Sequence, residues 1–187
     1  MRRVAAILFA FLLASTAFGQ QKNAFSVFYN DPSYWFSSSS GGHAEGGVGV
    51  AVSHAFSPIF STELSIARES YTLFANQTVS NGMISYDRVS VRTTPIDATA
   101  RYHFVNATRW KPYIGGGLRY VDTHEIGRGT FSPRYTFRSV EPEIVGGVVF
   151  QIRPRIGLIF DGKQLIGNRS LHSDPSFKGS IGFNWRF

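Results

Sequence analysis

The chain has 187 residues, which is enough for one domain and at most a small second one. It contains no Cys, so a disulfide framework and thiol chemistry are excluded, and its 17 Phe, 8 Tyr, 3 Trp and 19 Gly favour an all-β chain. The formal net charge of +7 is not gathered into a basic tract. We therefore expect a solvated surface or an anionic membrane partner, and no nucleic acid.

The first 19 residues have the three parts of a secretory signal peptide. Arg2 and Arg3 form a charged start, residues 4–13 form an apolar segment too short to span a bilayer comfortably, and residues 17–19 are suited to cleavage before Gln20. A retained anchor helix is the alternative. No later segment approaches the ~20 apolar residues of a membrane helix. The sequence predicts a signal peptide over residues 1–19 and an exported domain over residues 20–187, which enters a membrane only as a closed barrel.

Eight segments in which apolar and polar residues alternate follow the signal peptide, and they predict eight strands. In the second segment, for example, Val48, Val50 and Val52 share one face. Pro95 predicts a bulge in the fourth strand, because proline cannot donate to the ladder. The predicted strands cover residues 24–30, 46–56, 59–72, 89–104, 112–122, 135–152, 156–164 and 180–187.

The connections alternate between short and long. We expect short turns at residues 56–58, 105–111 and 153–155, and long connections at residues 31–43, 73–87, 123–134 and 165–176. Strands of ~10 residues with short turns on one side and long loops on the other are typical of an outer-membrane barrel. The sequence thus predicts an all-β, eight-stranded, antiparallel transmembrane β-barrel.

Aromatic residues flank the apolar bands, as they do in the interfacial girdles of membrane proteins. The turn-side set is Phe56, Phe60, Phe104, Trp110, Tyr113, Phe150 and Phe187, and the loop-side set is Tyr29, Tyr34, Trp35, Tyr71 and Phe74. The last strand carries Ile181, Phe183, Trp185 and Phe187 on one face. Such a strand suits a barrel in lipid better than the frayed end of a soluble sheet.

Two stretches resemble those of a known family. Ser180, Gly182, Trp185 and Phe187 are similar to the C-terminal assembly signal of bacterial outer-membrane barrels, and residues 101–104 with residues 111–118 are similar to a central hairpin. The chain therefore resembles the small eight-stranded barrels of the OmpA transmembrane, OmpX and OmpW type. This resemblance implies an outer-membrane location, both termini in the periplasm, and contact between the C-terminal strand and the barrel-assembly machinery.

The inward faces of the predicted strands carry acids and bases in nearly equal numbers. An eight-stranded barrel is just wide enough for side chains to fill it, and isolated charges there are costly, so we expect them to pair as a plug. A narrow ion path is the alternative. Glu141 and Glu143 share a face, but we interpret them as part of this lumen network and not as a catalytic pair. The predicted network is Glu63, Asp97, Arg101, Arg119, Glu141, Glu143, Asp161, Lys163 and Arg186.

The ends of the strands on the loop side are rich in Arg, which is suited to bidentate contacts with phosphate. We hypothesise that this rim contacts lipopolysaccharide phosphates, and a merely solvated rim is the equal alternative. The candidates are Arg68, Arg88, Arg92, Arg128, Arg134, Arg138 and Arg169.

An enzymatic role has one suggestive stretch, Leu171-His172-Ser173-Asp174 in the last long connection. Barrel-shaped lipid A deacylases use a His-any-Ser pattern, with both side chains on one face. His172 and Ser173 are adjacent and would point to opposite faces of a strand. We therefore expect no catalysis, and the histidines show no metal-ligand spacing and the sequence no cofactor motif.

The sequence favours a monomeric, non-enzymatic outer-membrane barrel with a structural or surface-interaction role. A small pore is the second reading and a lipid-modifying enzyme the third. The fourth is a soluble ligand-binding barrel of the lipocalin type, which requires the apolar faces to point inward. The predicted inward acids and bases contradict that arrangement.

Overall fold

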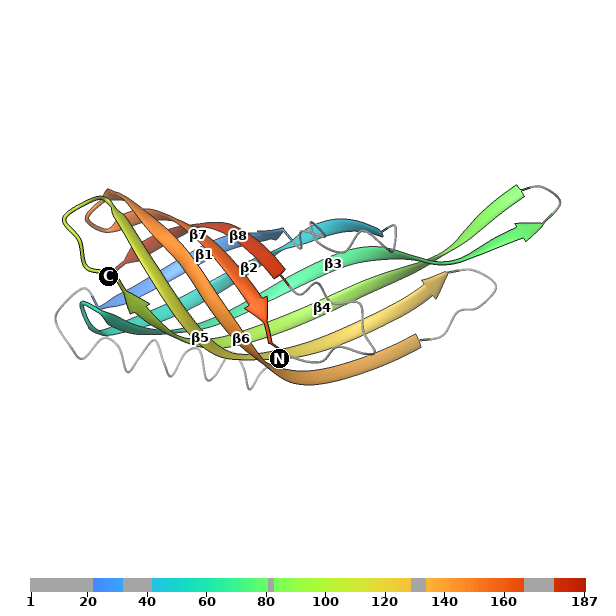
Figure 1. Cartoon of the computed structure of the whole chain (residues 1–187), viewed down its shortest axis with the longest axis horizontal. Helices are drawn as coiled ribbons and strands as arrows, with labels where there is room; N and C mark the ends of the chain where they lie inside the picture. The colour runs from blue at the N-terminus through green and yellow to red at the C-terminus, as the bar shows by residue number, and fades with distance from the viewer. Residues whose placement is uncertain (1–21, 32–41, 81–82, 129–133, 167–176) are drawn as a thin grey trace.

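The computed structural model describes residues 22–31, 42–80, 83–128, 134–166 and 177–187, with backbone only at residues 42–45, 71–89, 125–128 and 134–135. The proposed signal peptide lies outside these residues. The described chain forms eight strands (Figure 1). They are β1 (Asn23–Asp31), β2 (Gly42–Ser57), β3 (Phe60–Ser80), β4 (Met83–His103), β5 (Trp110–Arg128), β6 (Arg134–Arg153), β7 (Ile156–Leu165) and β8 (Phe177–Arg186).

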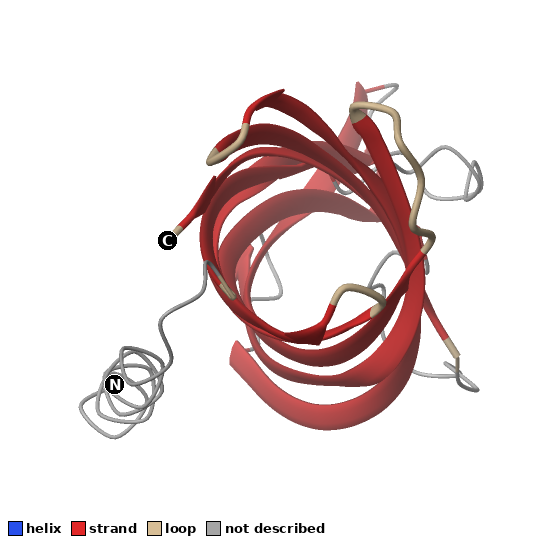
Figure 2. Cartoon of the chain, turned by 90° about the vertical axis from the view of Figure 1, so that its left-hand side faces the viewer, coloured by secondary structure: helices blue, strands red, loops and turns tan. Residues whose placement is uncertain are grey.

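The strands close into one antiparallel barrel in chain order, which confirms the predicted fold. Each strand pairs with the next, and β8 returns to pair with β1 from Ala24↔Arg186 to Asp31↔Gly179 (Figure 2). The turns after β2, β4 and β6 lie at the same end of the barrel as Phe187, and we name this the turn end (Figure 1). The opposite end is the loop end. In the described parts of the chain, no helix is long and apolar enough to cross a membrane.

The alternation along each strand places apolar side chains outside and polar side chains inside. In β8, Phe183 and Trp185 are 49% and 52% exposed on the outer face, whereas Lys178 and Asn184 are buried within the barrel. Water-soluble proteins rarely expose a continuous apolar surface of this kind, because its contact with water is unfavourable. The soluble lipocalin reading requires the reverse arrangement and is wrong.

The barrel wall is uneven in height. β3 to β6 have 19 to 21 residues each, whereas β1, β7 and β8 have 9 or 10. β3 pairs with β4 up to Ser80↔Met83, so most of the long connection predicted at residues 73–87 is a strand hairpin (Figure 1). The connection predicted at residues 123–134 is also mostly strand. The prediction was wrong because the apolar alternation fades there while backbone pairing continues.

Pro95 lies in an uninterrupted register, opposite Val121 of β5, so the predicted bulge at this residue is absent. On the β3 side, the pairs Ile66↔Ile96 and Glu69↔Thr93 flank Pro95 without a register change. The ladder therefore keeps its register at Pro95 although proline has no backbone N–H to donate. Register shifts occur elsewhere, and the shift between β2 and β3 beside Gly46 coincides with a φ of 77°, in the region that favours glycine.

Candidate functional site: a charged lumen

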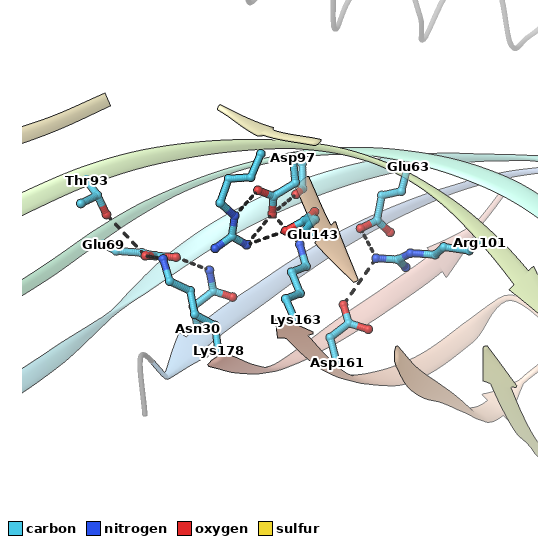
Figure 3. A network of polar contacts seen from close by, with 12 residues as sticks. Asn30, Glu63, Glu69, Thr93, Asp97, Arg101, Glu143, Asp161, Lys163 and Lys178 are labelled. Carbon is cyan, nitrogen blue, oxygen red and sulfur yellow. Dashed lines mark hydrogen bonds and ion pairs between the residues drawn. The ribbon is translucent and has the colours of Figure 1, made fainter. Parts of the chain in front are cut away.

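The lumen holds a column of ionic side chains that reach inward from opposite walls. They form three clusters along the barrel, in which nearly every charged side chain is at least nine-tenths buried (Figure 3). Strand alternation places them, because successive acids and bases on one strand are separated by even numbers of residues. Acids and bases are nearly matched in number, which limits the penalty of burying them.

The central cluster is organised around Asp97 of β4. Its Oδ1 accepts a hydrogen bond from Arg119 Nε at 2.7 Å, and its Oδ2 accepts one from Lys163 Nζ at 2.6 Å and one from Ser65 Oγ at 3.2 Å. Arg119 Nη2 also lies 3.2 Å from Glu143 Oε2. One carboxylate thus joins β3, β4, β5 and β7 across the lumen (Figure 3).

The turn-end cluster is organised around Arg101 of β4. Its Nη2 contacts Glu63 of β3 and lies 3.5 Å from Asp161 Oδ2 of β7. The guanidinium stands over the ring of Tyr113, with Cζ 4.7 Å from the ring centroid. Tyr113 is only 3% exposed, so its placement in the outer turn-side girdle was wrong. A tyrosine at an inward position of β5 fills the lumen beside the small residues Gly115 and Gly117.

The loop-end cluster is organised around Glu69 of β3. Its Oε2 pairs with Lys178 Nζ of β8 and accepts a hydrogen bond from Thr93 Oγ1 at 3.4 Å, and its Oε1 accepts one from Asn30 Nδ2 at 2.7 Å. The sequence analysis missed Glu69 and Lys178. The signal was present, since Glu69 is six residues from Glu63 and therefore on the same face of β3.

Seven of the nine residues predicted for the lumen network come together in these clusters: Glu63, Asp97, Arg101, Arg119, Glu143, Asp161 and Lys163. Glu141 is half-buried on the same face as Glu143 and accepts a hydrogen bond from Ser139 Oγ at 3.1 Å. Arg186 lies apart from the clusters, at the turn-end mouth of the lumen.

The Arg rim is only partly described. Arg68, Arg92 and Arg138 are exposed on the outer face toward the loop end. Arg138 Nε lies 3.5 Å from Asp122 Oδ1, and Arg92 pairs in register with His124. For Arg88, Arg128 and Arg134 the backbone alone is described, and the register places Arg88 opposite Arg128. Arg169 and the stretch from His172 to Asp174 lie outside the described residues.

The residues that resemble a C-terminal assembly signal lie at the seam that closes the barrel. Gly182 pairs with Phe28 of β1, and a Cβ at Gly182 would lie 2.6 Å from the Phe28 Cβ. Trp185 is exposed and packs near Phe187, with ring centroids 5.7 Å apart. Similar ring contacts join Phe56 to Phe60 and Trp110 to Phe150, so aromatic side chains gather on the outside at the turn end. Gly182 thus has a packing role, whatever recognises the strand during assembly.

Solved structures show which fold this architecture represents. The chain matches the outer membrane protein OprG of Pseudomonas aeruginosa with a TM-score of 0.60 at 11% identity, covering 89% of this chain and 96% of that one. It matches the N-terminal β-barrel domain of OprF from the same organism with a TM-score of 0.55 at 11% identity, covering 89% and 98%. The chain has the fold of the small outer-membrane barrels.

A third similar structure is Ail, the attachment invasion locus protein of Yersinia pestis, in complex with the heparin analogue sucrose octasulfate. Its TM-score is 0.53 at 12% identity, and the alignment covers 89% of this chain and 98% of that one. No known family model and no curated protein matches the sequence. The likeness is therefore one of fold, carried by strand number, order and closure.

Proposed function

We propose that this chain is a non-enzymatic outer-membrane barrel that is closed to ions and works through its outer surface at the loop end. The observation that carries the closed lumen is the central cluster, where Arg119, Asp97 and Lys163 meet across the barrel with side chains at most 7% exposed. An eight-stranded barrel leaves little space beside such a cluster. The exposed apolar outer wall and the solved outer-membrane barrels of the same fold support a membrane location.

Conductance in a planar bilayer tests the closed lumen. We expect residues 20–187, refolded and inserted, to give no reproducible current steps, because the ion pairs occupy the cross-section. Folding of the barrel is verified separately by heat-modifiable migration on a gel. Discrete steps whose size changes in Glu143→Gln or Arg119→Gln would instead assign a narrow pore, which is the second reading.

The surface role that we propose is contact with lipopolysaccharide phosphates through Arg68, Arg92 and Arg138. The three side chains are exposed on the outer face of β3, β4 and β6. Asp122, which is partly exposed, lies beside Arg138. The pair Ser70↔Arg92 places Arg92 beside the part of β3 that carries Arg68, and the pair Asp122↔Arg138 places Arg138 across β5, at the loop end of the apolar wall. Arg binds phosphate in a bidentate manner, so such a row suits an anionic lipid headgroup.

A charge-matched pair of variants tests this contact. In the double variant Arg92→Gln and Arg138→Gln, we expect less lipopolysaccharide to remain with the barrel during detergent purification. The control is Arg153→Gln with Arg155→Gln, which removes the same charge at the turn end. Equal retention by both double variants would contradict the proposal and favour a solvated rim.

A further inference from the structure

The lumen contains a cavity of about 520 Å³ at its turn end. Residues of all eight strands line it, for example Ser61 of β3, Ile159 of β7 and Asn184 of β8. The cavity is therefore the turn-end part of the lumen and not a surface groove. The turn-end cluster forms its inner boundary, because Arg101 and Glu63, which face each other in Figure 3, both line the cavity. Its volume is within the ~300–1,000 Å³ of small-molecule sites.

The two sides of the cavity differ in polarity. Val149, Ile159 and the ring of Tyr113 form an apolar wall, and each of them is at most 5% exposed. Polar groups stand around the rest, including Ser61, whose Oγ lies 2.7 Å from His103 Nε2. A pocket with an apolar wall and a few convergent polar groups is typical of a site for a small organic molecule.

The charge of the cavity is positive. Lys22, Arg101 and Arg186 line it, whereas Glu63 is the single carboxylate among its wall residues in the described chain. Glu63 is engaged by Arg101. Within the described residues, neither Lys22 nor Arg186 has an ion-pair partner. Uncompensated positive charge in a confined space attracts an anion strongly, because the surrounding dielectric constant is low.

Two buried polar atoms of the cavity wall lack hydrogen-bond partners in the described structure. They are Arg101 Nε and Tyr113 Oη, on side chains that are 3% exposed. Leaving such groups unsatisfied is unfavourable, so native proteins usually provide them with a partner. The guanidinium of Arg101 is therefore not fully satisfied by Glu63 and Asp161.

We propose that this cavity binds a small organic anion that enters from the turn end. Its carboxylate, or an equivalent oxyanion, accepts hydrogen bonds from Arg186 and Arg101 at the positive side. Its apolar part packs against Val149, Ile159 and the Tyr113 ring. The site is separate from the Arg rim, so the proposal does not depend on contact with lipopolysaccharide.

The test uses 4-fluorobenzoate as the probe, titrated against the refolded barrel in a neutral maltoside detergent and followed by ¹⁹F NMR. We expect saturable binding, and we expect 4-fluorobenzamide, which has the same shape without the charge, to bind at least about tenfold more weakly, since a charge-assisted hydrogen bond contributes roughly 1.5–3 kcal/mol. Equal affinity for the two probes, or no saturable binding of the benzoate, would overturn the proposal.

Variants locate the binding. Arg186→Gln should weaken binding of the benzoate about tenfold, while Arg109→Gln, an equal charge change at an exposed residue outside the cavity wall, should leave it unchanged. Equal weakening by both variants would mean attraction by net charge alone and would sink the assigned site. Lys22→Gln, outside the strand ladder, gives the same comparison if Arg186→Gln does not refold. Binding of inorganic phosphate without binding of the benzoate would refute an organic ligand.

Discussion

At the scale of single residues, Asp97 and Glu69 follow one rule: each is contacted by more than one donor or cation. Asp97 accepts hydrogen bonds from Arg119, Lys163 and Ser65. Glu69 accepts hydrogen bonds from Lys178, Asn30 and Thr93. Such contacts offset the desolvation penalty of a buried charge, which is several kcal/mol. Removing one member therefore affects stability far more than an exposed ion pair would suggest.

Asp97→Asn tests this rule at the central cluster. We expect it to destabilise the barrel by about 3–5 kcal/mol, because Arg119 and Lys163 lose the charge that both contact. Asp122→Asn is the matched control, since Asp122 lies 3.5 Å from an exposed Arg138, and its loss should cost about 0–1 kcal/mol. Urea unfolding in lipid vesicles, followed by Trp fluorescence, measures both. Equal effects would mean that lumen charges are well solvated.

Glu69 and Lys178 provide a second test, as a double-mutant cycle. Glu69→Gln and Lys178→Met should each be strongly destabilising, because each removes one half of a buried ion pair. The double variant should lose at least about 1 kcal/mol less than the sum of the two single losses. Additive losses in the same unfolding assay would show that the two side chains do not interact.

The sequence predicted which charges face inward, because a strand alternates strictly. It did not predict their partners, since Arg101 meets Asp161 and Lys163 meets Asp97 only after β4 and β7 are brought to opposite walls. Tyr113 was assigned outward from its residue type alone, although its position in β5 has the same parity as Arg119. The position of Tyr113 in the strand alternation therefore predicted its direction better than its residue type did.

At the scale of elements, β5 and β4 approach closely through glycines. A Cβ on Gly117 would lie 2.0 Å from the backbone oxygen of Ala98, and one on Gly115 would lie 2.2 Å from that of Ala100. A side chain at either position would press on the backbone of β4. These glycines thus allow the two strands to pack where Arg119 and Tyr113 fill the lumen.

Gly117→Ala is therefore expected to destabilise the barrel by about 1–3 kcal/mol through overpacking. Gly179→Ala is the matched control on β8, where a Cβ would meet nothing within 4 Å. Its effect should be within about 1 kcal/mol of zero. The same unfolding assay compares the two, and a neutral Gly117→Ala would show that β5 moves to accept the methyl group.

The number and order of strands were predictable from sequence, but the lengths of β3 to β6 were not. Alternation is readable only where one face meets an apolar environment and the other a polar one. Beyond residue 75, the sequence of β3 has three consecutive polar residues, Asn76-Gln77-Thr78, so strict alternation is lost there. Backbone pairing then extends the strands without a sequence signal.

At the scale of the whole molecule, the uneven wall leaves part of β6 with one neighbour. Pairing with β7 begins at Glu143↔Leu165, whereas pairing with β5 extends to Ile126↔Arg134. Residues 134–141 therefore have a ladder on the β5 side alone among the described strands. In an antiparallel sheet, successive residues direct their amides to opposite sides.

Hydrogen exchange should report this asymmetry. We expect every second amide between residues 134 and 141 to exchange fast, whereas amides of residues 144–150, which have strands on both sides, exchange slowly. NMR exchange measurements on the refolded barrel resolve the two groups. Uniform protection across residues 134–141 would reveal that a further segment pairs with this edge.

The lumen ion pairs also bear on how the barrel forms. Lys178 and Glu69 are 109 residues apart in the chain, and Lys163 and Asp97 are 66 apart, so neither pair exists until β7 and β8 have met the opposite wall. A partly inserted open sheet would hold these charges unpaired against hydrocarbon, which is strongly unfavourable. Such intermediates should be too sparse to accumulate. Insertion of the strands and closure of the barrel are then expected to occur together, in one concerted step.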